Sequence, residues 1–381
     1  MAFLTSQIAL SIDAILPALE VIGSDLNVAD IKDSQLIIIS LFLGMSFSQF
    51  LFGPISDSIG RKPSIAIGIG IFLIGSLFSI YAEDLTTMLI GRFIQGIGIA
   101  SPRVVTIAII RDTYQGSAMA RIMSFMMTIF IIIPIIAPTF GYWVMTLSNW
   151  RMIFIIIALL SSLILVWFYI RQVETLKAEH QQTLDINTIL FNLKIIIKNK
   201  KVMAYTTING LIFGSFLGYL SASQHIFQNI FDTGELFPYY FAALAATFGV
   251  SSLLNAKWVI RLGSHLLTQR SLIAIITISS ITTIANVLFK MPINLIAGMI
   301  YLSFIFFFVG FLFGNLSSLA MEPLGKLAGI GSGVVGSLSL VISIVIGHLI
   351  GTSLETSILN LVIGFLLCAL ASLGIMKIAE S

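Results

Sequence analysis

The stretch Gly53-Pro-Ile-Ser-Asp57-Ser-Ile-Gly60-Arg61-Lys62-Pro63 separates two long apolar runs, residues 36–52 and 64–82. Two apolar runs of this length, joined by a short polar link, are typical of a helix that crosses a membrane and a second helix that returns. This pattern predicts a helical membrane protein.

The residues of this link have expected roles that follow from their chemistry. Gly53 and Gly60 are expected to allow close helix approach and a tight reversal. Asp57 lies near a helix end, where it can pair with Arg61 or with a basic group of a neighbouring helix. Arg61 and Lys62 are expected to hold the turn on the cytoplasmic side.

The composition of the whole chain agrees with a membrane location. Of the 381 residues, 57% are hydrophobic and 10% are charged, whereas a soluble domain carries about 25% charged residues. The net charge of +3 does not indicate nucleic acid, because the basic residues alternate with the apolar runs and form no single patch. The one cysteine, Cys368, lies in an apolar run and allows no internal disulfide, and neither a metal nor an organic cofactor is implied.

Twelve apolar stretches approach the length of about 20 residues that a membrane-crossing helix needs. Helices are the expected form, because a span in lipid must satisfy its own backbone hydrogen bonds. The stretches are residues 2–22, 36–56, 63–82, 86–110, 122–146, 151–171, 203–225, 237–258, 271–289, 292–320, 327–350 and 354–377.

The distribution of lysine and arginine predicts the orientation. If both termini are cytoplasmic, fifteen basic residues lie in the cytoplasmic links and only Lys32, Arg151 and Lys290 lie outside. Such an excess of positive charge is the usual mark of the cytoplasmic side. The fold class predicted is therefore an all-α membrane protein of twelve helices with both ends inside.

The longest polar stretch, residues 172–201, divides these spans into six and six. The expected organisation is a six-helix bundle over 1–171, a cytoplasmic linker, and a second six-helix bundle over 202–381. Within the linker, Ile189–Ile197 has helix-like apolar spacing and is either a helix on the membrane surface or part of a solvated linker. Residues 256–265 occupy in the second half the place of the first-half link, and they keep its glycine and basic character but not its aspartate.

Charged residues inside the spans are the first candidates for function, because each costs about 3 kcal/mol or more in lipid. Asp13 lies near the middle of the first span. An apolar cavity disfavours its carboxylate form, so the group could bind and release a proton at physiological pH. The alternative is a structural ion pair with an arginine of another helix.

The fourth span carries two arginines. Arg92 and Gln95 are three residues apart and share a helix face. Arg103 follows Arg92 by close to three turns, so both guanidinium groups could face one cavity, where they would influence an opposing acid or hold an anionic substrate. Purely structural arginines are the alternative. Arg111 and Asp112 close this span and are expected at the cytoplasmic gate.

The fifth span contains Pro134, Pro138 and Gly141. Two prolines in one apolar helix impose bends, which are useful where an element moves between two states. A kinked helix with only a packing role is the alternative.

Several of these segments resemble the motifs of one family. The link Gly53–Lys62 is similar to the signature loop of the major facilitator superfamily, and Arg92-Phe-Ile-Gln95-Gly96-Ile-Gly98 to its fourth-helix motif. Asp13-Ala-Ile-Leu-Pro-Ala-Leu, the proline-rich fifth span and residues 315–329 resemble the drug:proton antiporters of the bicyclomycin/chloramphenicol-resistance (Bcr/CflA) type.

This resemblance implies a secondary transporter that works by alternating access. It would exchange protons for hydrophobic or amphipathic small molecules across a bacterial inner (plasma) membrane, as a monomer. Asp13 would carry the proton, Arg92 and Arg103 would tune it, and Asp57, Arg61 and Arg111 would stabilise the outward-open state. The alternative is a carrier of the same fold for one metabolite, such as a siderophore or a sugar, by export or import. No enzyme motif and no phosphate-binding loop is present, so neither catalysis nor ATP hydrolysis is expected.

Overall fold

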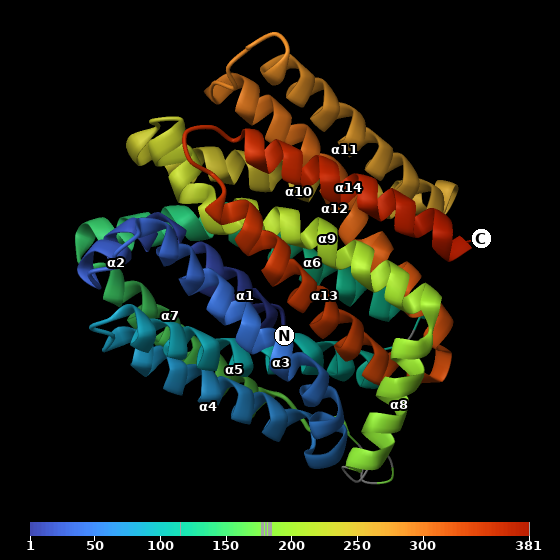
Figure 1. Cartoon of the computed structure of the whole chain (residues 1–381). Coiled ribbons are helices and arrows are strands. Elements are labelled where there is room, and N and C mark those ends of the chain that lie inside the picture. Colours follow the sequence, from blue (N-terminus) through green and yellow to red (C-terminus); the bar gives the residue numbers. More distant parts are fainter. Residues whose placement is uncertain (115, 177–178, 180, 182–184, 381) are drawn as a thin grey trace. The chain divides into compact units, whose positions relative to one another are not determined.

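The computed structural model describes residues 1–114, 116–176, 179, 181 and 185–380. The described residues form helices joined by short links, with no strand among them (Figure 1). The helices of the first half are α1 (Ala2–Asp13), α2 (Leu19–Asp25), α3 (Leu36–Ile59), α4 (Arg61–Ile80), α5 (Leu85–Thr113), α6 (Gly116–Leu147) and α7 (Trp150–Arg171). Those that follow are α8 (Ile186–Lys198), α9 (Lys200–Gln224), α10 (Phe237–Leu262), α11 (Ser264–Val287), α12 (Leu295–Met321), α13 (Ala328–Thr352) and α14 (Leu359–Glu380).

Each of the twelve apolar stretches falls on helical structure. Ten helices are long and apolar enough to cross a membrane by length and composition among the described residues. The other two stretches lie on α6, whose apolar segment Ile132–Leu147 is shorter, and on α9, a less apolar helix of 25 residues. The apolar stretches thus predicted where the helices lie, because a backbone in lipid has almost no alternative to the helix.

The predicted link between the second and third spans is shorter than expected. Helix α3 continues to Ile59 and α4 begins at Arg61, so the reversal is made by Gly60 alone, with φ of +106°. Gly53 lies inside α3, and no described atom lies within 4 Å of a Cβ placed on it. The prediction that Gly53 allows close helix approach is wrong, because the close approaches of α3 occur one to three turns earlier.

The linker between the two halves is partly helical. Helix α8 confirms the helical spacing seen over Ile189–Ile197. Its location on the membrane surface stays a prediction. Residues 177–178, 180 and 182–184 of the linker lie outside the described part of the chain.

The chain divides into two compact units, which are described separately. The first contains Met1–Leu193 and Ser332–Ser337, and the second contains Lys194–Gly331 and Leu338–Ser381.

Helix α5 is the centre of the first unit, where it packs against α1, α3, α4 and α7 (Figure 1). Its contact with α3 depends on two glycines. A Cβ on Gly96 would lie 2.0 Å from the carbonyl oxygen of Leu41, and a Cβ on Gly44 would lie 2.0 Å from that of Phe93. Backbone thus meets backbone, which is how helices in lipid gain dispersion contacts when no hydrophobic effect drives them together.

In the second unit α12 packs against α9, α10 and α11, and α9 also packs against α14. The contact between α9 and α13 again uses glycine, but here isoleucine side chains fill the space. Gly210, Gly214 and Gly218 face Ile342, Ile346 and Ile350 in turn. The Ser343 hydroxyl donates to the Gly210 carbonyl at 2.9 Å, which adds a polar contact to the apolar one.

The two units repeat one pattern of helix contacts. The pairs α3–α5, α4–α5 and α4–α7 of the first unit correspond to α10–α12, α11–α12 and α11–α14 of the second. Gly263, with φ of +76°, joins α10 to α11 as Gly60 joins α3 to α4. The related halves that the sequence indicated weakly are therefore visible in the structure.

We expect Gly96→Ala to destabilise the protein by about 1–3 kcal/mol, because its new methyl group would overpack the α3–α5 contact. Gly70→Ala on α4 is the matched control, since no described atom lies within 4 Å of its added Cβ. That variant should be neutral or slightly more stable. Thermal unfolding in detergent measures both; equal midpoints for the two variants would contradict this packing.

Candidate functional site

The first span is broken beside its acidic residue. Helix α1 ends at Asp13, a short 3-10 turn covers Leu16–Ala18, and α2 follows from Leu19. Pro17 has no N–H to donate to the carbonyl of Asp13, four residues earlier, so the regular ladder stops there. Broken helices at membrane depth are typical of binding sites in transporters.

Asp13 is buried at this break, with 5% of its surface exposed. Its side chain makes no hydrogen bond or ion pair with the described residues. Helix α6 crosses closely here, because a Cβ on Gly141 would lie 1.7 Å from the carbonyl oxygen of Ala14. Gly141 therefore has a definite packing role, and α6 continues as one helix through Pro134 and Pro138.

Arg92 is the most connected side chain near the break, and it is 1% exposed. Its Nη2 donates to the carbonyl of Ser11 at 3.1 Å, and its Nε to the carbonyl of Ile37 at 3.2 Å. Its guanidinium also lies 5.7 Å from the ring centre of Phe154. Because the last carbonyls of a helix lack partners and carry partial negative charge, a cation at the end of α1 is well placed.

Gln95 extends this network to a further helix. Arg92 Nη1 donates to Gln95 Oε1 at 2.7 Å, and Gln95 Nε2 donates to the Ser76 hydroxyl at 2.9 Å. Ser76 belongs to α4, so one connected set of hydrogen bonds and ring contacts links α1, α3, α4, α5 and α7. The second unit has a counterpart on the matching helices, where the hydroxyls of Ser279 and Tyr301 are 3.0 Å apart.

The structure brings together some of the residues predicted for the membrane interior and separates others. Arg92 and Gln95 are bonded to each other, whereas Arg92 and Asp13 form no ion pair in the described structure. Arg103 differs from Arg92 because its side chain is exposed and has no hydrogen-bond or ion-pair partner among the described residues.

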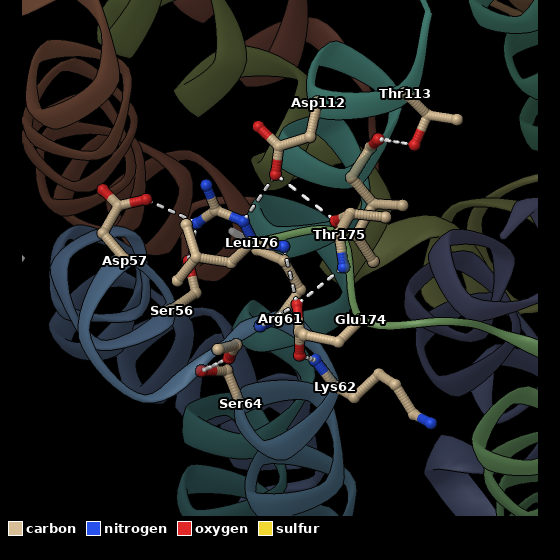
Figure 2. Close-up of polar contacts among 12 residues, drawn as sticks. Ser56, Asp57, Arg61, Lys62, Ser64, Asp112, Thr113, Glu174, Thr175 and Leu176 are labelled. Carbon is tan, nitrogen blue, oxygen red and sulfur yellow. Dashed lines mark hydrogen bonds and ion pairs between the residues drawn. The ribbon is translucent and has the colours of Figure 1, made fainter. Parts of the chain in front are cut away.

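A second polar cluster forms where α3 and α5 end and α4 begins (Figure 2). Arg61 Nε donates to Asp112 Oδ2 at 2.9 Å, while its Nη1 donates to the Ser56 hydroxyl at 2.8 Å and to Asp57 Oδ1. Arg61 is buried between these two carboxylates. It therefore pairs with Asp57 of α3, as the sequence suggested, and also with Asp112 of α5. Arg111, the neighbour of Asp112, is exposed and makes no polar contact with the described residues.

Glu174 also belongs to this cluster, although no sequence motif marks it. Its Oε1 accepts from the backbone N–H of Arg61 at 3.1 Å, and its Oε2 from that of Lys62 at 3.0 Å (Figure 2). Oε1 also accepts from the N–H groups of Thr175 and Leu176, each at 2.9 Å. Glu174 thus caps the first turn of α4, where free N–H groups and the helix dipole favour a negative charge.

The helix start itself explains why the cap comes from elsewhere. The residue before α4 is Gly60, which has no side chain to offer, and a Cβ on it would lie 2.8 Å from Glu174 Oε2. The signal in the sequence is weak, because Glu174 lies 113 residues from Arg61. Lys62 adds a contact on the same side, its Nζ lying 4.6 Å from the ring centre of Tyr169.

The carboxyl and guanidinium groups of both clusters can hold protons and charges. The described residues contain no group of three or more His, Cys, Asp or Glu that could hold a metal ion. Asp13, Arg92 and Gln95 lie inside helices long enough to cross a bilayer. The class defined by these helices is an integral membrane protein built from two units of like helix order.

The chain belongs to the Major Facilitator Superfamily, a family of transporters, whose family model matches residues 1–348. The uncharacterized MFS-type transporter YdgK of Bacillus subtilis is 28% identical over 98% of this chain and 94% of its own. A bicyclomycin resistance protein homolog of Haemophilus influenzae is 28% identical over 90% of this chain and 85% of its own. The multidrug resistance protein MdtL of Vibrio parahaemolyticus is 33% identical over 69% of this chain and 64% of its own.

Solved structures show the same fold at low identity. The xylose transporter XylE of E. coli, in a partially occluded inward-open conformation, aligns with a TM-score of 0.72 at 13% identity and covers 99% of this chain and 96% of that one. A D-xylose–proton symporter gives the same TM-score at 14% identity, with 97% and 95% coverage. The family match and the apolar helices together make the chain a multi-pass membrane transporter.

The cap on α4 should weaken in acid. Burial opposes ionisation of Glu174, but the N–H groups of Leu176, Lys62, Arg61 and Thr175 outweigh it and lower the pKa of this carboxyl below its ordinary value of 4.5. A lowered pKa means that the charge stabilises the fold above about pH 4.5, and that this contribution is lost as the pH falls through the folded-state value.

We expect Glu174→Gln to lower stability by about 1 kcal/mol at pH 7, and the difference from the native protein to shrink below pH 4.5. Thermal unfolding in detergent between pH 8 and pH 3.5 measures both. Glu83→Gln, which removes an acid at an exposed position, is the control. A difference that persists unchanged at pH 3.5 would contradict a charge-dependent cap.

Proposed function

We propose that the protein is a proton-coupled antiporter that exports hydrophobic or amphipathic small molecules, drugs among them, by alternating access. The observation that carries the proton coupling is Asp13: a buried carboxyl at the break of the first span that makes no polar contact with the described residues. The names of two relatives, a bicyclomycin resistance protein homolog and the multidrug resistance protein MdtL, support drug export.

Asp13 suits a proton carrier because its environment discriminates between its two forms. A carboxylate in a dry, apolar site is strongly disfavoured unless it is paired, whereas the neutral acid is tolerated. When the site opens to water or admits a substrate, the balance between the two forms changes. In the proposed cycle Asp13 takes up a proton facing outward and releases it facing inward.

Arg92 acts in this proposal by fixing the place where Asp13 sits. Its guanidinium holds the carbonyl of Ser11, two residues before Asp13, and Gln95 fixes the guanidinium in turn. Gly141 lets α6 pack closely against the backbone of Ala14, next to Asp13. A shift of α6, with its two prolines, against α1 is the motion that would change the surroundings of Asp13.

The cluster around Arg61 has a gating role in this proposal. It ties the ends of α3, α4 and α5 together through Asp57 and Asp112, and Glu174 secures the first turn of α4. Such a rigid end lets the first unit move as one body during alternating access. Arg111, exposed beside Asp112, is available to contact other parts of the protein or lipid.

The proposed topology has twelve spans with both termini in the cytoplasm of a bacterium. The ten apolar helices, together with α6 and α9, supply the spans, and the excess of lysine and arginine in alternate links supports the orientation. The proposed domains are a bundle over 1–171, a linker over 172–201 and a bundle over 202–381, acting as a monomer in the inner membrane.

Removing the charge of Asp13 should abolish coupling. Inverted vesicles with an acidic interior, followed with a fluorescent amine, should release protons when candidate drugs are added to the native protein. Asp13→Asn should show no such release, because an amide cannot carry the proton, while Asp13→Glu should retain part of it. The amount of folded protein in each vesicle preparation is measured alongside.

The outcomes separate the proposals. Proton release that survives Asp13→Asn would move the proton site elsewhere, and Glu20 in α2 would be tested next. Release with a single compound from a broad panel would favour the alternative, a carrier for one metabolite such as a siderophore or a sugar. No release with any compound from folded protein would contradict drug export.

The topology is tested with single cysteines in a Cys368→Ser background. A membrane-impermeant maleimide added to intact cells should label Glu83→Cys, in the link between α4 and α5. It should label Lys198→Cys, at the end of α8, only after the membrane is opened. Labelling of Lys198→Cys in intact cells would reverse the proposed orientation.

A further inference from the structure

Arg103 is an arginine within a predicted span of the first unit that has no hydrogen-bond or ion-pair partner among the described residues. It lies within α5, about 27 Å from the first residue of that helix and about 15 Å from the last, at 1.5 Å per residue. Its side chain is exposed. Ile107, one turn further along, is 44% exposed, so the two mark an open stripe of α5.

Lipid is a poor environment for this group. An unpaired guanidinium deep in a bilayer is costly, and long basic side chains avoid the cost by reaching to the nearer membrane surface. The nearer end of α5 is its C-terminal end. Because Cα–Cβ bonds in a helix tilt toward the N-terminus, the side chain of Arg103 leans away from that surface. The stripe is therefore expected to face a water-accessible path.

Arg92, the arginine in the first half of α5, is not available to a ligand. Arg92 is buried, and its Nε, Nη1 and Nη2 all donate to groups of the protein. Asp13 is also remote, because it lies near the Arg92 end of α5, and eleven residues of helix separate Arg92 from Arg103 by about 16 Å. Asp13, the proposed proton carrier, therefore does not neutralise the charge of Arg103.

We propose that Arg103 is the subsite for a negatively charged group of the transported molecule, a carboxylate or another oxyanion. The inference rests on the proposed function and narrows its substrates to amphipathic molecules that carry an anionic group. The guanidinium offers paired N–H donors that match an oxyanion, and Ile107 offers an apolar surface beside it.

The test compares two dyes of the same ring system, anionic fluorescein and cationic rhodamine 123, binding to purified protein in neutral detergent. The native protein should bind fluorescein more tightly. Arg103→Gln should weaken fluorescein binding roughly tenfold or more, the loss expected for a charge-assisted hydrogen bond, and leave rhodamine 123 unchanged or tighter. Arg103→Lys should keep part of the affinity, and Arg171→Gln, at an exposed position that ends α7, should have no effect.

Equal loss of both dyes in Arg103→Gln would show a general structural role and overturn the inference. Preference for rhodamine 123 in the native protein would overturn it too, while leaving drug export intact. If phosphatidylglycerol added to the micelles displaces fluorescein, a lipid headgroup occupies the site and the substrate assignment falls. If the native protein binds neither dye nor any compound of a drug panel, the proposed function fails and this inference with it.

Discussion

The arrangement of the first unit depends on the buried guanidinium of Arg92. It donates to the carbonyls of Ser11 and Ile37 and to Gln95, so that α1, α3 and α5 are joined through one cation. A membrane interior offers no water to replace such donors, and an unsatisfied carbonyl there costs several kcal/mol. Arg92 supplies such a donor at the broken end of α1, and Asp13 lies two residues from the carbonyl that it binds.

The two units share an order of helix contacts but differ in the chemistry inside them. In the first, glycines bring α5 against the backbone of α3, and the interior contains an acid and an arginine. In the second, isoleucine side chains of α13 pack against glycines of α9. Aromatic rings fill the space between α9 and α12, where the ring centres of Phe216 and Phe306 are 5.4 Å apart. The acid and the arginine within the spans of the first unit suit proton chemistry, whereas the interior of the second unit combines aromatic rings with neutral polar contacts such as that between Ser279 and Tyr301.

The end of the first unit shows how a turn can depend on a distant residue. Gly60 reverses the chain in one step, and Glu174, beyond the sixth predicted span, supplies the cap that the glycine lacks. Gly263 makes the equivalent reversal in the second unit, and no described atom lies within 4 Å of a Cβ placed there. The same backbone turn is thus built twice, but it is capped by a remote acid only in the first unit, as far as the described residues extend.

The sequence by itself determined where the helices lie and which charged residues were unusual. Both are local properties, because a span in lipid must be helical and a charge in it is costly wherever its partners are. Only the tertiary structure decided what those residues do. Arg92 binds backbone carbonyls 81 and 55 residues away, and carbonyl groups leave no mark in an amino-acid sequence. Gly53 and Gly96 are the same residue type in neighbouring helices, yet only Gly96 meets another helix, because packing depends on what lies opposite and not on the residue alone.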